Sequence, residues 1–211
     1  KEDLSGLEAI DQMPGISRFG LDSIEKEIEE LMNLGIKAVA LFPVINPNKK
    51  DENGSEAINQ NNLICNAIKN IKSSFPEIII ISDVALDPYT NHGHDGILVN
   101  SYVDNDKTLD QLVKQSVALA RSGADIIAPS DMMDGRIKAI RSALEENDFK
   151  NTILLSYAAK YNSKFYGPFR SAVGSSSNLG KSSKAEYQMD VANSNEALNE
   201  VALDINEGAD I

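Results

Sequence analysis

Four short runs of consecutive apolar residues recur along this 211-residue chain, and segments with helical periodicity separate them. The runs lie at 37–42, 77–84, 125–129 and 153–157, and the second contains four isoleucines in succession. Strands that are apolar on both faces are typical of a parallel sheet covered by helices, because both faces are then buried. The sequence therefore predicts the α/β class, as either a β/α barrel or a doubly wound sheet.

The segments between these runs predict helices with identifiable ends. Two of them begin at residue pairs with capping-box spacing and end at glycine: Asp22 with Glu25 and then Gly35, and Thr108 with Gln111 and then Gly123. Apolar residues at helical period predict three more, between Ala57 and Phe75, over 135–146, and from Ser194 to Gly208.

Polar residues follow the ends of the predicted strands and favour the barrel. Asp83, Ser130, Asp131 and Lys160 lie at or just after strand C-termini. In a barrel these ends converge on one mouth, whereas an open sheet brings them together only at a switch point. A barrel needs eight strands in about 250 residues. We therefore expect one domain over 1–211, which forms four to five β/α units of an incomplete TIM (β/α)8 barrel. The N-terminal arm, the first strand and the C-terminal strands are expected to be missing.

Charge and cysteine content limit the partners. The net charge of −12 argues against a nucleic acid or an anionic membrane, both of which require a basic face. No apolar run reaches the roughly 18 residues of a membrane span, so we expect a cytoplasmic or plastid-stromal protein. Cys65 is the only cysteine and lies in an apolar helical pattern, which excludes an intrachain disulfide and predicts a buried helix residue.

Lys160 follows the fourth strand, in a loop rich in aromatic residues. Five of these lie within nine residues of it: Tyr157, Tyr161, Phe165, Tyr166 and Phe169. Crowding by such rings desolvates an ammonium and favours the neutral amine, which can attack a ketone and form an imine. The alternative is a lysine that extends past the rings to solvent.

Residues 82–96 place three aspartates, Asp83, Asp87 and Asp95, directly after the second strand, together with His92 and His94. Such a cluster suits metal ligation, binding of a substrate ammonium, or proton transfer. It could equally be a surface loop with Asx turns. The two histidines are weak evidence for zinc, because no further ligand motif accompanies them.

The Gly- and Ser-rich segment 174–182 has five residues between its glycines, where a phosphate-binding P-loop requires four. A mobile lid, in which Arg170, Lys181 and Lys184 clamp a carboxylate, is one reading, and a solvated loop is the other. Asp134 could be a helix N-cap or a magnesium ligand, and Glu200 could lie on a solvated helix face.

Several segments together resemble the porphobilinogen synthase family, also called 5-aminolevulinate dehydratase. The matching stretches lie at 13–16, 34–43, 83–96, 128–136, 156–170 and 187–189. The resemblance implies a homo-oligomeric, usually octameric, β/α-barrel lyase that condenses two 5-aminolevulinate molecules into porphobilinogen with loss of water.

The resemblance also implies residue roles. In the family each substrate ketone can form an imine with one of two lysines; Lys160 matches the first, and the second would lie beyond Ile211. An isolated chain with one lysine is therefore expected to be inactive. Asp83 and Ser130 match positions for substrate orientation and proton transfer. Four further residues match the substrate-carboxylate site: Arg170, Lys184, Gln188 and Phe169.

The resemblance also implies which metal the protein uses. Zinc-dependent members carry three cysteines where this chain has Ala85, Asp87 and Asp95, so a catalytic zinc of the three-cysteine type is not expected. The aspartate-rich branch uses magnesium, sometimes with potassium, and Asp87 and Asp95 then become candidates for substrate binding. Asp134 and Glu200 match an allosteric magnesium site with water-mediated contacts.

Two other functions remain open at this point. A class I aldolase would use Lys160 for a single imine and would need no second lysine. A non-catalytic subunit would bind magnesium or modulate an oligomer without forming an imine.

Overall fold

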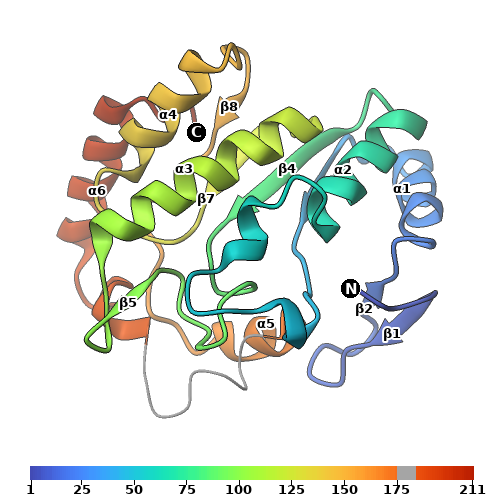
Figure 1. Cartoon of the computed structure of the whole chain (residues 1–211), viewed down its shortest axis with the longest axis horizontal. Helices are drawn as coiled ribbons and strands as arrows, with labels where there is room; N and C mark the ends of the chain where they lie inside the picture. The colour runs from blue at the N-terminus through green and yellow to red at the C-terminus, as the bar shows by residue number, and fades with distance from the viewer. Residues whose placement is uncertain (175–183) are drawn as a thin grey trace.

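The computed structural model describes residues 1–174 and 184–211 and is built around a parallel sheet (Figure 1). The strand order is β3-β4-β7-β8, and every neighbouring pair is parallel. The strands comprise Ala38–Leu41 (β3), Ile79–Val84 (β4), Ile126–Pro129 (β7) and Ile153–Leu154 (β8). Each lies in one of the four apolar runs, so the predicted α/β class with a parallel sheet is confirmed.

Five helices accompany the sheet, and each of them contacts the next. They are α1 (Ile24–Asn33), α2 (Leu63–Ser74), α3 (Asn105–Ser122), α4 (Arg136–Glu146) and α6 (Ser194–Glu207). In Figure 1 they follow one another around one side of the sheet, from α1 to α6. The apolar faces of α1 to α4 form the core with the strands, and Ile68, Ile80, Leu112, Ile127 and Ile137 are fully buried there. On α6 the large apolar side chains are exposed, and the only buried residue is Asp204.

Both predicted capping boxes are wrong, although the glycine ends are right. Ser23 precedes α1, and the Asp22 carboxylate instead accepts hydrogen bonds from the Gly6 amide at 3.0 Å and the Ser5 hydroxyl at 2.7 Å. The Asp22 carboxylate therefore binds residues distant in the sequence and not the amides at the start of α1. Helix α3 begins earlier, because Asp104 accepts a hydrogen bond from the Lys107 amide, and Thr108 is buried inside the helix.

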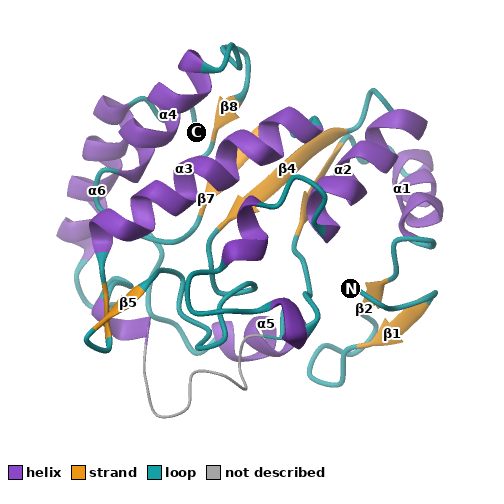
Figure 2. Ribbon diagram, in the orientation of Figure 1, coloured by secondary structure: helices purple, strands orange, loops and turns teal. Residues whose placement is uncertain are grey.

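Several short elements were not predicted from periodicity. Two hairpins occur, Leu7–Ala9 with Ser17–Phe19 (β1, β2) and Leu98–Val99 with Tyr102–Val103 (β5, β6). A further helix, α5 (Tyr166–Ala172), lies in the predicted loop after β8. Short 3-10 helices comprise Pro47–Lys49, Ser55–Ile58 and Lys184–Glu186. Figure 2 shows α5 and the β5–β6 hairpin at the end of the sheet towards which β4 points.

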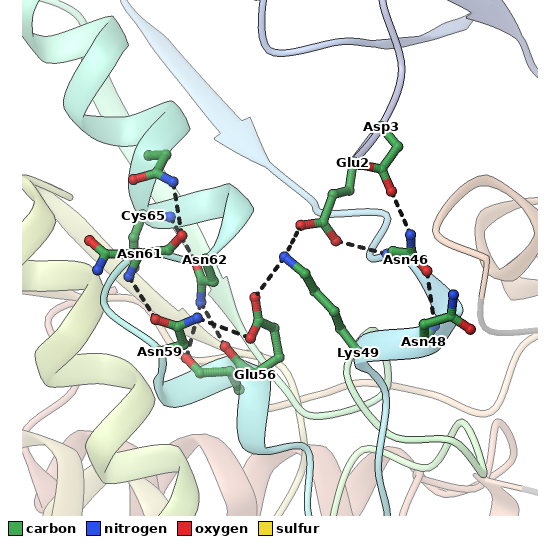
Figure 3. Close-up of polar contacts among 12 residues, drawn as sticks. Glu2, Asp3, Asn46, Asn48, Lys49, Glu56, Asn59, Asn61, Asn62 and Cys65 are labelled. Carbon is green, nitrogen blue, oxygen red and sulfur yellow. Dashed lines mark hydrogen bonds and ion pairs between the residues drawn. The ribbon is translucent and has the colours of Figure 1, made fainter.

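The segment after β3 is held by polar contacts with the N-terminal residues (Figure 3). Glu2 accepts hydrogen bonds from the Asn46 amide at 2.9 Å and from the Lys49 ammonium, which also lies 3.5 Å from Glu56. Asn62 caps α2 by accepting a hydrogen bond from the Cys65 amide at 2.8 Å. The segment 46–62 is thereby tied to the N-terminal residues at one end and to the start of α2 at the other.

Cys65 is fully buried in α2, as its apolar surroundings in the sequence predict, and its Sγ lies 3.9 Å from the Ala118 carbonyl oxygen. Among residues 1–174 and 184–211, no helix is long and apolar enough to cross a membrane.

Candidate active site

A single pocket at the C-terminal ends of the strands collects the residues singled out in the sequence. Asp83 comes from the end of β4, Ser130 directly follows β7, and Lys160 follows β8. The other predicted residues on the pocket wall come from α5, from the loop after β4 and from the segment 184–188: Phe169, Arg170, Asp87, Lys184 and Gln188. Asp95 adjoins them through its contacts with Lys160 and Lys184. The parallel strands thus bring distant polar side chains to one place.

The buried amine of Lys160 contacts two polar groups and one aromatic ring. Its ammonium donates a hydrogen bond to the Ser130 carbonyl oxygen and lies 4.0 Å from Asp95 Oδ2. The Tyr166 ring centroid is 5.5 Å away, but Phe165, which was also expected near the amine, is 92% exposed. The Lys160 side chain is only 8% exposed, so it does not extend to solvent.

Two aspartates share the ammonium of Lys184. Its Nζ lies 3.0 Å from Asp87 Oδ2 and 2.7 Å from Asp95 Oδ1, and its side chain is buried. Burial alone would lower the pKa of Lys184, but the two carboxylates outweigh burial and raise it. Lys184 is therefore a paired cation inside the site, and most of its charge is already balanced by Asp87 and Asp95.

The two aspartates that bind Lys184 differ in their protonation equilibria. Burial raises the pKa of Asp87, and Lys184 only partly opposes this effect. Burial also acts on Asp95, but Lys160 and Lys184 together hold the pKa of Asp95 below its usual range. Asp95 is consequently the more firmly ionised partner of the two lysines.

Asp83 has the properties of a group that exchanges protons near neutral pH. Burial raises the pKa of Asp83 to about 7, and a hydrogen bond from the Ser130 side chain opposes part of the rise. Within the described residues, its buried Oδ1 atom has no hydrogen-bond partner. A carboxyl group whose pKa lies close to the working pH is suited to general acid–base catalysis.

Asp83 should make stability fall as the pH rises. The native state holds this proton up to about pH 7, whereas the unfolded chain releases it near the ordinary aspartate pKa of 3.8, so folding binds a proton between these limits. We expect the free energy of unfolding to decrease between about pH 4 and pH 7, and Asp83→Asn to remove part of the decrease. Urea titrations of both proteins at several pH values measure this. Parallel pH profiles would contradict the assignment.

A second buried network of charged and polar side chains, which the sequence did not reveal, adjoins the pocket. Arg136 of α4 lies 3.7 Å from Asp131 and 3.5 Å from Asp204 of α6, and donates a hydrogen bond to Ser156 Oγ at 3.0 Å. Burial raises the pKa of Asp131 to about 6, although Arg136 opposes the rise. Since Asp131 follows Ser130, this network connects the carbonyl that binds Lys160 to α4, α6 and the end of β8.

Asp134 and Glu200 lie apart from this pocket. Gly135, with φ 74°, and not Asp134 occupies the N-cap position of α4, so the N-cap interpretation of Asp134 is wrong. Burial raises the pKa of Glu200, and the negative charges of Asp204 and Asp134 add to this effect. Among the described residues, no three His, Cys, Asp or Glu side chains form a group that could hold a metal ion. A cation here would need water among its ligands.

The remaining predicted motifs do not reach the pocket wall. His94 Nδ1 lies 3.3 Å from the Tyr187 hydroxyl, and His92 Nε2 lies 3.2 Å from the Glu52 carbonyl oxygen. Burial lowers the pKa of both histidines. The lid and P-loop readings of 174–182, including Lys181, fall almost wholly outside the described residues.

Known proteins resemble the chain over its whole length. The family model for delta-aminolevulinic acid dehydratase matches residues 1–211. The delta-aminolevulinic acid dehydratase of Bradyrhizobium diazoefficiens is 52% identical over 204 residues, which are 97% of this chain and 58% of that protein. The enzyme of the same name from Methanothermus sociabilis is 48% identical over all of this chain and 64% of its own.

A solved structure has the same fold as the described chain. The crystal structure of delta-aminolevulinic acid dehydratase (porphobilinogen synthase) from Toxoplasma gondii, in complex with the reaction product porphobilinogen, superposes with a TM-score of 0.96 and 44% identity. The match covers 99% of this chain and 59% of that one, so the chain spans less than two thirds of the length of these relatives. On this similarity of sequence and structure, the chain belongs to the delta-aminolevulinic acid dehydratase family.

Proposed function

We propose that this chain provides the first imine-forming site of a porphobilinogen synthase, a lyase that condenses two 5-aminolevulinate molecules into porphobilinogen with loss of water. The observation that carries the proposal is the buried amine of Lys160 at the ends of the strands, next to Asp83 and Asp95. A relative whose structure contains porphobilinogen supports it. We further propose that residues 1–211 are one domain of a β/α barrel in a homo-oligomeric, octameric enzyme.

The pocket suits imine formation by Lys160. The neutral amine nitrogen adds to the ketone carbon, and the resulting carbinolamine loses its hydroxyl group as water to leave the imine. Asp83, whose pKa is about 7, can donate a proton to the departing hydroxyl and later accept one. The Ser130 carbonyl oxygen directs the Lys160 amine into the pocket through their hydrogen bond.

The substrate carboxylate is assigned to the α5 side of the pocket. Arg170 can hold it as a fork of hydrogen-bond donors, and Phe169 covers the carbon chain beside it. Gln188 is buried nearby and is available to hydrogen-bond the same ligand, because its Oε1 atom has no partner within the described residues. Lys184 contributes through Asp87 and Asp95, which place a balanced cation next to the bound substrate.

Magnesium is the metal that the donor atoms favour. The active site has carboxylates, not thiolates, at positions 87 and 95, and hard oxygen ligands favour magnesium over zinc. Asp87 and Asp95 are already paired with the Lys184 ammonium, so the ion is assigned to another place. Asp134 and Glu200 are the residues that would hold the ion, with waters completing its coordination, and potassium could accompany it elsewhere. When bound there, the cation would offset the repulsion that Asp204 and Asp134 exert on Glu200.

Magnesium should bind at the site of Asp134 and Glu200. We expect Glu200→Gln to weaken binding about tenfold, because it removes a charged oxygen ligand from a site with few protein ligands. Isothermal calorimetry with MgCl2 measures the change, and Glu146→Gln, an exposed substitution on α4, is the control. Equal affinities in the Glu200→Gln and control proteins would refute this assignment.

Borohydride trapping tests the proposed function directly. Incubation with 5-aminolevulinate and borohydride should leave a stable secondary amine on Lys160, which peptide mapping locates. A class I aldolase would instead trap sugar phosphates and leave 5-aminolevulinate unmodified. A non-catalytic magnesium-binding subunit would trap neither compound.

The expected environment of the protein follows from its charge and its relatives. We propose a cytoplasmic or plastid-stromal location without nucleic-acid or membrane partners, supported by the net charge of −12 and by soybean and pea relatives named as chloroplastic.

A further inference from the structure

Arg18 of β2 reaches the C-terminal end of α5, far along the chain. Its Nε donates a hydrogen bond to the Ala172 carbonyl oxygen at 2.7 Å, and its Nη2 donates one to the Ser171 carbonyl oxygen, also at 2.7 Å. Its Nη1 pairs with Glu8, which lies directly opposite Arg18 in the β1–β2 hairpin. A planar guanidinium held in this way presents its donors in a fixed geometry. The hairpin therefore holds the last turn of α5.

Lys50 holds the same helix end from another direction. Its Nζ donates a hydrogen bond to the Gly174 carbonyl oxygen at 3.3 Å. Lys50 follows Lys49, which the contacts with Glu2 and Glu56 fix in place (Figure 3). Cations near the C-terminus of a helix also interact favourably with its dipole. Two cations from separate parts of the chain thus bind carbonyl oxygens at the end of α5 and just after it.

Helix α5 has little else of its own to fix its position. None of its residues from Tyr166 to Ala172 is buried, and it contains Gly167 and Pro168. A short helix without a buried face gains little stability from packing. Nevertheless α5 supplies Phe169 and Arg170 to the pocket, and the Phe169 ring meets Phe42 edge-on with 5.3 Å between centroids. The location of these two side chains depends on how α5 is anchored.

We propose that Arg18 and Lys50 are positioning residues, which hold the C-terminal end of α5 so that Arg170 and Phe169 face the carboxylate of a substrate bound at Lys160. The role in substrate binding rests on the proposed function, whereas the anchoring of α5 does not. Arg18 is the cleaner residue to test, because Lys50 also lies close enough to Asp87 to interact with its charge.

Trapping of two ketones distinguishes a loss of Arg170 positioning from general damage to the site. Borohydride trapping at Lys160 is measured against concentration for levulinate, which has a carboxylate, and for 2-pentanone, which has none. We expect Arg18→Met to raise the half-saturating concentration of levulinate about tenfold, the effect of about one lost charge-assisted hydrogen bond. The half-saturating concentration of 2-pentanone should change much less, because this ketone has no carboxylate for Arg170 to bind. Arg18→Lys should restore part of the loss. Arg121→Met, an exposed substitution on α3, is the matched control.

Hydrogen exchange measures the anchor without any substrate. We expect amides 166–173 to exchange faster in Arg18→Met and in Lys50→Met, and the amides of α6 to be unaffected. Unchanged exchange in α5, or an equal loss of trapping for both ketones, would overturn the proposal. If the unsubstituted protein traps neither ketone, the proposed function fails, and with it the role of Arg18 in substrate binding. The exchange rates would still decide whether Arg18 anchors α5.

Discussion

Replacing Lys160 with arginine should reduce borohydride trapping of 5-aminolevulinate to the background of the reagent. Arginine keeps a positive charge near Asp95 and can still donate to the Ser130 carbonyl oxygen, so the contacts of the Lys160 ammonium are largely preserved. A guanidinium stays protonated and cannot act as the nucleophile that forms an imine. Mass spectrometry of the reduced protein should show one adduct in the unsubstituted chain and none in Lys160→Arg.

The exposed Lys164, four residues further along the same loop, provides the control. Lys164→Arg should trap 5-aminolevulinate as well as the unsubstituted chain does. An adduct that persists in Lys160→Arg, or that maps to Lys184, would contradict the assignment of the nucleophile. Circular dichroism of each protein separates a lost nucleophile from a lost fold.

Replacing Arg136 with methionine should lower the free energy of unfolding by about 3–5 kcal/mol, because it removes one partner from a buried ionic network. The side chain of Arg136 is 3% exposed, and its loss leaves Asp131 and Asp204 buried without their shared cation. Methionine retains the apolar stem of Arg136 but not its guanidinium, so the effect arises mainly from the unpaired carboxylates. Urea unfolding at neutral pH measures it.

The exposed Lys138 on the same helix is the matched control, and Lys138→Met should change stability by less than about 0.5 kcal/mol. The cost of Arg136→Met should also shrink at acidic pH, since the raised pKa of Asp131, about 6, lets that carboxyl become neutral. A loss of stability that is small at neutral pH would show that the network contributes little to the fold.

The fold could be predicted from short-range patterns in the sequence, and the details at helix ends could not. Apolar runs without alternation require burial on both faces, and this requirement holds wherever the strands lie in the sheet. Capping depends on which hydrogen-bond donor lies nearest to the oxygen of the capping side chain. Asp22 has the right spacing for a cap, but the Gly6 amide and the Ser5 hydroxyl, sixteen and seventeen residues earlier, bind its carboxylate instead.

The sequence predicted which residues lie in the pocket better than it predicted which of them form ion pairs. Asp83, Ser130 and Lys160 follow three strands of one parallel sheet, so their convergence follows from topology. The pairing of Lys184 with Asp87 and Asp95 joins residues 97 and 89 positions apart, and nothing in their local sequence indicates it. The aromatic crowding expected around Lys160 was partly wrong, because Phe165 points into solvent at the start of α5.

By itself, the sequence determined the strands, the helices between them and the residues at the strand ends, since apolar periodicity and strand direction act over a few residues. Only the tertiary structure decided which charges face one another: Lys160 with Asp95, Arg136 with Asp131 and Asp204, and Arg18 with the end of α5. The physical reason is that burial makes a charge depend on its nearest partner, and here that partner comes from a different part of the chain.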